Sequence, residues 1–317
     1  MLFFVTARRR VPSTRDTHEA CTHSFHPEAV AVDALERAVM TISCRDSDRI
    51  PKVADAGQIR DEGGLRVQVM HNGLKVLAGG YYGAWMSQVI RGLRGHHEPQ
   101  EELVYSHLLQ YVRHDSLMVE LGSFWAYYTL WYLREIPGSR ALCVEPDPMY
   151  IEVGKRNAML NAVGQRIRFV EAWVGGDDCE NHVAPCESTG EARALPCVNM
   201  GGVLRIAEAS PIELLHIDTQ GVELAFIRSM ESSVREGRVR FLIASTHHSS
   251  ISGSPATHDD CLRELERMGA IILTEHSVQE SFSGDGLIAC SFLPSDRRIG
   301  MPEITRNRAI NSMFPTP

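Results

Sequence analysis

The sequence predicts an α/β protein in which a mostly parallel, seven-stranded sheet is covered by helices on both faces. Runs of four to six largely apolar residues recur along the second part of the chain, at residues 117–121, 141–145, 167–170, 214–218, 240–245, 271–274 and 287–292. Runs this short, bounded by turn residues, are typical of buried strands. Most of the stretches between them are long enough for a helix, and this alternation favours a parallel sheet. The last two runs are close together, so we expect them to pair antiparallel at the edge of the sheet.

The 317-residue chain divides into three predicted parts: an N-terminal extension over residues 1–100, the sheet-forming domain over 101–295 and a C-terminal tail over 296–317. In the extension we expect a helix over 29–40 and a hairpin over 65–77, because Asn72-Gly73 is a strong turn signal between apolar runs. Further helices are expected over 86–93 and 100–112. The stretch 175–200 carries no clear pattern and is predicted to be a loop.

The composition is that of an ordinary globular protein, with 44% hydrophobic and 23% charged residues. A formal net charge of −8 argues against a nonspecific nucleic-acid binder, which would normally present a basic surface. No apolar run approaches the roughly 20 residues that span a bilayer, and the first residues lack the order of a signal peptide. We therefore expect a cytoplasmic protein without a membrane partner. Its eight cysteines include no Cys-x-x-Cys pair, so a zinc site of paired cysteines is not expected.

Acidic residues stand at the ends of the first two predicted strands, where doubly wound sheets bind their ligands. Glu120 and Gly122 end the first strand, and Glu145 ends the second. Gly122 allows a tight turn and a close backbone approach to a ligand. A carboxylate at position 145 can accept hydrogen bonds from both hydroxyls of a ribose. An ordinary strand-turn-helix without a ligand is the alternative interpretation of these residues.

The turn after the first strand distinguishes between two nucleotide cofactors. A dinucleotide site needs a glycine-rich turn that brings a helix N-terminus to the diphosphate, but this turn carries the bulky Phe124 and Trp125. S-adenosylmethionine has no phosphate, so the bulky turn favours it over NAD. The Glu120 carboxylate or the Gly122 carbonyl oxygen could hold its ammonium group.

Three segments carry a family resemblance: residues 119–129 (VELGSFWAYYT), residues 144–148 (VEPDP) followed by Asn157 and Asn161, and residues 215–223 (LHIDTQGVE). Over residues 95–293 the sequence resembles the FkbM-type class I S-adenosylmethionine-dependent O-methyltransferases. The third segment is the most specific, whereas the first departs from the family pattern with Ala126 in place of a second glycine. The resemblance implies a Rossmann-like methyltransferase fold, with Glu145 on the ribose and Ala172 and Trp173 beside the adenine. The predicted cofactor contacts are Glu120, Gly122, Ser123, Phe124, Glu145, Pro146, Ala172, Trp173 and Asp218.

Methylation of an alcohol requires the loss of its proton, which a base or a metal ion assists. Asp218 ends the fourth strand, and His247 and His248 follow the fifth. One hypothesis makes His247 or His248 the general base. A second has Asp218 bind a divalent ion together with one or both histidines, and such mixed ligands suit a transition metal. In the plainest alternative the histidines only cap a strand or a helix end.

The acceptor site is expected to involve Tyr81, Tyr82, Trp85, Gln220 and Glu280. Aromatic and polar side chains interleave before the sheet domain, as suits a sugar or polyol, although a lid packed on the core or a homodimer contact is equally consistent. The segment 275–286 could line the pocket, or its Gly284 and Gly286 could simply allow a hairpin turn. The predicted function is O-methylation of a sugar, glycoside or other small-molecule secondary metabolite. A nicotinamide-dependent oxidoreductase and a non-catalytic cofactor-binding protein are the alternatives.

Overall fold

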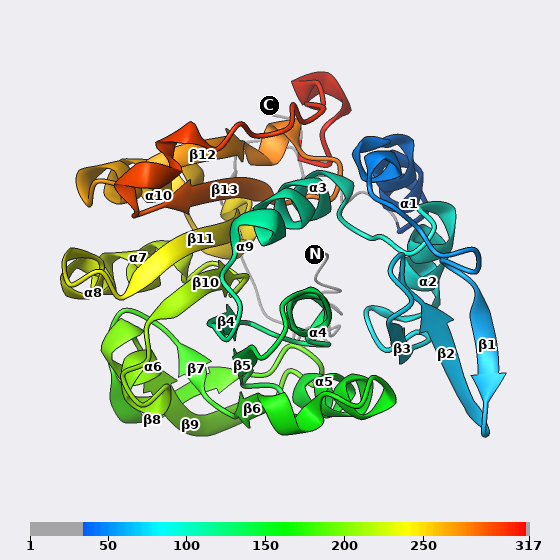
Figure 1. Cartoon of the computed structure of the whole chain (residues 1–317), viewed down its shortest axis with the longest axis horizontal. Coiled ribbons are helices and arrows are strands. Elements are labelled where there is room, and N and C mark those ends of the chain that lie inside the picture. Colours follow the sequence, from blue (N-terminus) through cyan, green and yellow to red (C-terminus); the bar gives the residue numbers. More distant parts are fainter. Residues whose placement is uncertain (1–33, 315–317) are drawn as a thin grey trace, which may run out of the picture.

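The computed structural model describes residues 34–314 and contains the predicted seven-stranded sheet (Figure 1). Its strand order is β12-β13-β11-β10-β4-β5-β6. The five strands from β11 to the edge strand β6 run parallel, and β13 runs antiparallel to both of its neighbours. The predicted antiparallel pair is confirmed, with β13 inserted between β11 and the edge strand β12. The strands are β4 (Leu117–Leu121), β5 (Arg140–Val144), β6 (Ile167–Val170), β10 (Ile212–Ile217), β11 (Val239–Thr246), β12 (Ile271–His276) and β13 (Gly286–Ser291).

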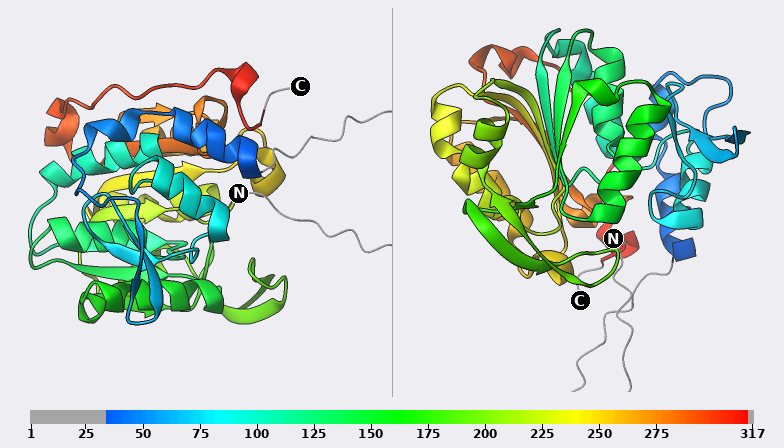
Figure 2. Two further views of the ribbon diagram at one scale, coloured as in Figure 1. Left: turned by 90° about the vertical axis from the view of Figure 1, so that its right-hand side faces the viewer. Right: turned by 90° about the horizontal axis from the view of Figure 1, so that it is seen from below.

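Two hydrophobic cores lie on opposite faces of the sheet, and the view from below shows helices on both faces (Figure 2). Successive side chains of β4 alternate between them: Met118 belongs to one core, and Leu117 and Val119 belong to the other. The first face carries α3 (Pro99–Leu108), α4 (Tyr127–Glu135) and α5 (Pro148–Leu160). The second carries α6 (Met200–Ile206), α7 (Glu223–Ser229) and α10 (Thr257–Arg267), with α8 (Glu231–Arg235) directly after α7. Both faces are therefore covered, as the sequence predicts.

The N-terminal extension packs on the first of these faces, beside α4 and α5 (Figure 1). It comprises α1 (Ala34–Ser43), β1 (Ile59–Glu62), β2 (Leu65–Val69), β3 (Lys75–Leu77) and α2 (Gly83–Gly92). The predicted hairpin is confirmed as β2 and β3, to which β1 adds a third strand. The Asn157 and Asn161 side chains of α5 accept hydrogen bonds from the backbone N–H groups of Leu77 and Lys75, at 2.8 and 2.9 Å. These bonds attach the hairpin to the sheet domain. Residues 29–33 of the expected first helix lie outside the described residues.

The prediction of a loop over residues 175–200 is wrong. The antiparallel strands β8 (Cys179–Pro185) and β9 (Ala192–Val198) occupy most of it and form a third sheet with β7 (Trp173–Val174). Most residues of β8 are exposed, so this strand lacks the apolar side chains by which buried strands are recognised. Short helical turns complete the described chain: η1 (Asp46–Arg49), η2 (Leu109–Tyr111), η3 (Gly164–Arg166), α9 (Ser249–Ser252), η4 (Val278–Glu280), η5 (Pro294–Arg298) and η6 (Ala309–Asn311).

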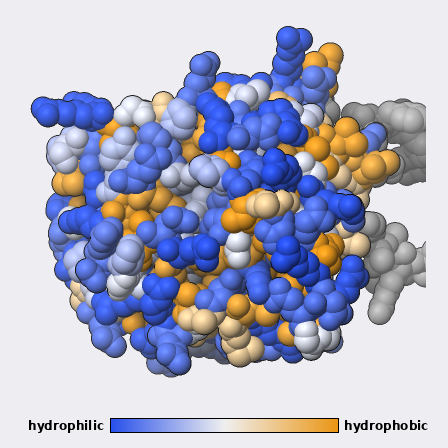
Figure 3. Space-filling view, turned by 45° about the vertical axis from the view of Figure 1, so that its right-hand side comes forward, coloured by the Kyte–Doolittle hydropathy of each residue, from blue (hydrophilic) through white to orange (hydrophobic). Residues whose placement is uncertain are grey.

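Within residues 34–314, no helix combines the length and the apolar character that crossing a membrane requires. On the face shown in Figure 3, hydrophilic residues predominate and apolar residues lie in small groups between them. The expected homodimer stays a prediction.

Candidate functional site

The candidate site lies where the strand order of the sheet reverses, at the carboxyl ends of β4 and β10. This is the position at which open α/β sheets bind ligands. The loops after the two strands touch, because the backbone N–H of Asp218 donates to the Leu121 carbonyl oxygen at 2.9 Å. Gly122 has a φ of +75°, and a Cβ atom there would lie 1.7 Å from the Asp218 carbonyl oxygen. Only glycine fits this position.

Glu145, at the end of β5, lies beside this loop with its carboxylate held by backbone groups. One oxygen, Oε2, accepts a hydrogen bond from the Phe124 N–H at 3.0 Å, and Oε1 accepts one from the Asp147 N–H at 2.9 Å. Burial raises the pKa of Glu145 to about 8, although these two N–H groups act in the opposite direction. A carboxylate offers about four acceptor positions, so about two remain for hydroxyls of a ligand.

The unpredicted β8–β9 hairpin closes one side of this region. Asp147 caps α5 by accepting from the Met149 N–H at 2.9 Å, and it also accepts from the N–H and the hydroxyl of Ser188, both at 2.8 Å. The Pro146 carbonyl oxygen accepts from Arg193 of β9 at 2.9 Å. Trp173, predicted beside the adenine, donates its indole N–H to the Arg193 carbonyl oxygen at 3.3 Å. The hairpin therefore belongs to the surroundings of the site.

Aromatic rings fill the turn after β4. Phe124 stacks on Tyr150 of α5 with the ring centres 3.5 Å apart, and Trp125 stacks on Tyr81 of the extension at 4.5 Å. Ala126, where the family pattern has a second glycine, adopts a left-handed φ of 59°. This conformation costs a non-glycine residue about 1–2 kcal/mol. The turn thus keeps a backbone shape that glycine favours, although its side chains are large.

His247 is surrounded by carboxylates at the end of β11. Its Nδ1 is hydrogen-bonded to Glu223 Oε1 at 2.9 Å, and its Nε2 lies 3.2 Å from Asp218 Oδ1 and 3.6 Å from Asp285 Oδ1. Burial alone would lower the pKa of His247, but the neighbouring carboxylates, led by Glu223 and Asp285, outweigh it and raise the pKa well above its usual range. The imidazole is therefore protonated at neutral pH. Burial raises the pKa of Asp218, which favours that carboxylate over His247 as the proton acceptor.

Glu223 also shapes the loop that follows β10. Its Oε1 accepts hydrogen bonds from the N–H groups of Gly221 and Thr219, at 2.9 and 3.3 Å. Burial would raise the pKa of Glu223, but the positive charge of His247 keeps it below its ordinary value. Glu223 thus links this loop to the end of β11. Gln220 lies in the loop with a left-handed φ of 62°, and its Oε1 is buried without a hydrogen-bond partner in the described chain.

Two predicted site residues are engaged elsewhere. His248 does not join His247 and Asp218: it caps α9 by accepting from the Ser250 N–H at 3.2 Å, and its ring stacks on Phe314 at 4.2 Å. These contacts favour the capping alternative for His248, and its metal-ligand and base roles stay predictions. Glu280 accepts from the Ser277 N–H at 3.0 Å in a capping box and pairs with Arg306 at 2.6 Å. Its predicted substrate contact stays a prediction.

The other predicted residues lie in varied surroundings. Glu120 accepts from the Thr129 N–H of α4 at 3.1 Å, and burial raises its pKa to about 7. Tyr82 is hydrogen-bonded to Glu187 of the hairpin loop at 3.3 Å. Trp85 packs under the Arg37 guanidinium, at 5.6 Å from its ring centre. The roles predicted for these residues, and for Ser123 and Ala172, stay predictions.

One group among the described residues, His71, His96 and Glu102, has potential metal ligand atoms within 4.8 Å of one another. Glu102 already receives hydrogen bonds from the His97 N–H at 2.7 Å, from Tyr127 Oη at 3.2 Å and from the His96 ring. The His71 and His96 rings are stacked, 4.2 Å apart and inclined by 18°, so their lone pairs run side by side rather than converge on an ion. We interpret this group as a hydrogen-bonded network that joins the extension to α4.

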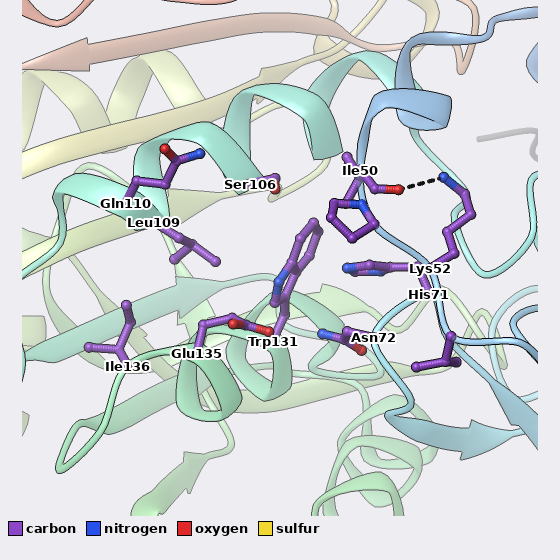
Figure 4. Close-up of a pocket in the computed structure, with 12 residues that line it drawn as sticks. Ile50, Lys52, His71, Asn72, Ser106, Leu109, Gln110, Trp131, Glu135 and Ile136 are labelled. Atoms are coloured by element: carbon purple, nitrogen blue, oxygen red, sulfur yellow. Dashed lines mark hydrogen bonds between the residues drawn. The ribbon is translucent and has the colours of Figure 1, made fainter.

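A cavity of about 530 Å³ lies outside the candidate site (Figure 4). It is bounded by Trp131, Glu135 and Ile136 at the far end of α4 and by His71 of the extension. Lys52 at its rim donates to the Ile50 carbonyl oxygen at 2.9 Å. None of the residues predicted to bind the cofactor or the acceptor lines it.

The strand order, which reverses between β4 and β10, defines a doubly wound, Rossmann-like α/β fold. Neither protein-family models nor curated protein sequences match the chain. Among solved structures, an O-methyltransferase from Bacillus cereus in complex with SAH is 14% identical, with a TM-score of 0.39 over 61% of this chain and 80% of that one.

Two further structures are similar at the same level. A precorrin-6y C5,15-methyltransferase from Geobacter metallireducens is 12% identical, with a TM-score of 0.39 over 61% of this chain and 87% of that one. Fibrillarin from Aeropyrum pernix, with natively bound S-adenosyl-L-methionine, is 13% identical, with a TM-score of 0.36 over 56% of this chain and 67% of that one. These similarities are distant.

Proposed function

We propose that this protein is an S-adenosylmethionine-dependent methyltransferase that methylates a hydroxyl group of a sugar, glycoside or other small molecule. The observation that supports this most is the Glu145 carboxylate at the end of β5, held by the backbone N–H groups of Phe124 and Asp147. An acidic side chain in this position of a doubly wound sheet binds the ribose hydroxyls of a nucleotide.

The residues around Glu145 fit S-adenosylmethionine better than a dinucleotide. The turn after β4 is filled by Phe124 and Trp125, which are both buried, whereas a diphosphate needs open backbone N–H groups at a helix N-terminus. Ser123 Oγ and Gln220 Oε1 are buried without hydrogen-bond partners in residues 34–314. Buried polar atoms normally have partners, and the amino-acid part of the cofactor brings donors and acceptors. When bound, the cofactor supplies an electrophilic methyl group on a sulfonium.

In this scheme Asp218 accepts the proton of the acceptor hydroxyl. His247, which Glu223 holds through Nδ1, positions the Asp218 carboxylate from 3.2 Å. Holding the nucleophile in line with the methyl group supplies much of the remaining catalysis. A divalent ion bound by Asp218 and His247 is the second form of the proposal, and activity measured after chelation and metal add-back separates the two.

Calorimetry with S-adenosylmethionine, SAH and NAD tests the cofactor. We expect the first two to bind and Glu145→Gln to weaken both by about tenfold, since a hydrogen bond between neutral groups contributes about 0.5–1.5 kcal/mol and tenfold corresponds to about 1.4 kcal/mol. Glu152→Gln, which removes an exposed carboxylate paired with Arg156 on the same helix α5, is the matched control. Tight binding of NAD instead would favour the oxidoreductase alternative. A screen of hydroxylated acceptors for SAH release distinguishes an enzyme from a non-catalytic binding protein.

A further inference from the structure

Three carboxylates from three separate segments lie near enough for their charges to affect one another's pKa. Asp218 follows β10, Asp285 precedes β13, and Glu98 precedes α3. The two aspartates face His247 Nε2 at 3.2 and 3.6 Å. Glu98 Oε2 accepts from Tyr128 Oη at 2.9 Å and lies 3.2 Å from His97 Nε2. Glu98 and Asp285 belong to loops that contribute nothing to the cofactor pocket around Glu145, so they are available to a second ligand.

Aromatic rings adjoin these carboxylates. The Tyr81 and Trp125 rings are stacked with an angle of 8° between them, and the His97 ring meets Trp125 edge-on at 4.9 Å. Burial, and then the charges of Glu98 and Asp218, raise the pKa of the Tyr81 hydroxyl, with a smaller effect from Asp285. The Tyr81 ring meets the His97 ring edge-on at 5.3 Å, and His97 is the ion-pair partner of Glu98. Ring faces beside carboxylates recognise organic cations.

Polar atoms in this cluster lack hydrogen-bond partners. The His247 side chain is fully buried (0% exposed), and its Nε2 makes no hydrogen bond within residues 34–314. The same holds for Oδ1 of Asp218 and of Asp285. His247 also forms an ion pair with Glu223, to which its Nδ1 is hydrogen-bonded. Arg37, a nearby cation, donates to the Ser283 carbonyl oxygen at 2.6 Å. His247 is the ion-pair partner of Asp218, Asp285 and Glu223, so one positive charge faces three carboxylates. An excess of buried negative charge is costly, and it favours a ligand that brings a positive charge and a hydrogen-bond acceptor.

We propose that the acceptor is a positively charged amino alcohol, with an ammonium group next to the hydroxyl that is methylated. The ammonium lies between Asp285 and Glu98 against the ring of Tyr81. The hydroxyl oxygen accepts a hydrogen bond from His247 Nε2. As the new bond from this oxygen to the methyl carbon forms, the bond from that carbon to sulfur breaks with its electron pair, and the hydroxyl proton passes to Asp218. This inference rests on the proposed function and names its substrate class.

The geometry favours an organic cation over a metal ion. A group that could hold a metal ion has all its ligand atoms within 4.8 Å of one another. Within the described chain, Asp218, His247 and Asp285 do not form such a group. An ammonium group has three donors that reach separate acceptors, which suits carboxylates on three segments. The Tyr81 ring face attracts an organic cation more strongly than it attracts a hydrated metal ion.

The test uses the full chain saturated with SAH and two probes that differ in charge: trans-2-aminocyclohexanol and its neutral N-acetyl derivative. Binding is followed by ligand-observed NMR and by tryptophan fluorescence. We expect the amine to bind at least about tenfold more tightly than the amide, which corresponds to about 1.4 kcal/mol. Asp285→Asn and Glu98→Gln should each reduce this preference by at least about threefold. Asp260→Asn, an exposed carboxylate paired with Arg263 on α10, should leave the preference unchanged.

Each variant must keep its affinity for SAH, which shows that the fold and the cofactor pocket are intact. Equal binding of amine and amide, or saturable binding of neither, would overturn the inference while leaving the proposed function in place. Binding of Mg²⁺ or Mn²⁺ that is lost in Asp285→Asn would also overturn it, because the cation would then be a metal. Failure of SAH to bind the wild-type chain would instead refute the proposed function.

Discussion

Replacing Gly122 by alanine tests the contact between the loops after β4 and β10. The new Cβ would stand 1.7 Å from the Asp218 carbonyl oxygen, whereas real Cβ atoms essentially never approach closer than 3.0 Å. One loop must therefore move by about 1.3 Å. This movement would break the hydrogen bond from the Asp218 N–H to the Leu121 carbonyl oxygen. The left-handed φ of +75° adds about 1–2 kcal/mol for a non-glycine residue, and the lost bond adds about 1 kcal/mol.

We therefore expect Gly122→Ala to lower the free energy of unfolding by about 2–3 kcal/mol and to weaken binding of S-adenosylmethionine at least about tenfold. Urea unfolding and calorimetry measure the two effects. Gly164→Ala is the matched control, because its new Cβ would meet only the Ala158 Cβ at 4.0 Å and its φ is not left-handed. If Gly122→Ala matched this control in both measurements, the contact would not organise the cofactor site.

The remaining predictions concern the titratable groups of the site. His247→Ala leaves the buried Glu223 without its charged partner and should cost about 3–5 kcal/mol in urea unfolding. His248→Ala removes the cap of α9 and the stacking on Phe314 and should cost about 1–2 kcal/mol without changing cofactor affinity; equal losses would contradict this assignment. Glu223→Gln should weaken cofactor binding by loosening the loop over residues 218–221, which calorimetry measures against the exposed control Glu231→Gln. Because Glu145 has a folded-state pKa of about 8 against an ordinary value of 4.5, the folded ligand-free protein holds the extra proton between these values. Its stability should therefore fall by up to a few kcal/mol as the pH rises from about 4.5 to about 8, and Glu145→Gln should remove this part of the slope in urea midpoints measured across that range.

The sheet could be predicted from the sequence because its strands are buried on both faces. Their apolar runs and the intervening helix-length stretches follow directly from that burial, and the ends of β4 and β5 then place Gly122 and Glu145 at the site. The β8–β9 hairpin could not be predicted from apolar runs because most of its residues are exposed. Its contribution, through Ser188 and Arg193, consists of hydrogen bonds that leave no periodic pattern in the sequence.

The pairing of charged residues was the least predictable feature. His247 and His248 both follow directly after β11, but they have different partners: His247 is directed to Glu223, and His248 caps the next helix. Asp285 reaches His247 from a loop 38 positions away. Such contacts depend on the three-dimensional arrangement of the loops, and the only signal in the sequence was the clustering of acidic residues at predicted strand ends.

The position of Glu98 connects the extension to the acceptor site through α3. Glu101 of this helix is bonded to His216 of β10 at 2.7 Å and to Ser245 of β11 at 2.8 Å. These buried contacts hold the start of α3 against the carboxyl-end half of the sheet. Glu98 therefore projects from a rigidly anchored helix rather than from a free loop. Glu98 and Tyr81 precede β4, the first strand of the seven-stranded sheet in chain order. Substitutions in residues 79–98 could therefore change the proposed acceptor specificity while Gly122 and Glu145 keep the proposed cofactor site unchanged.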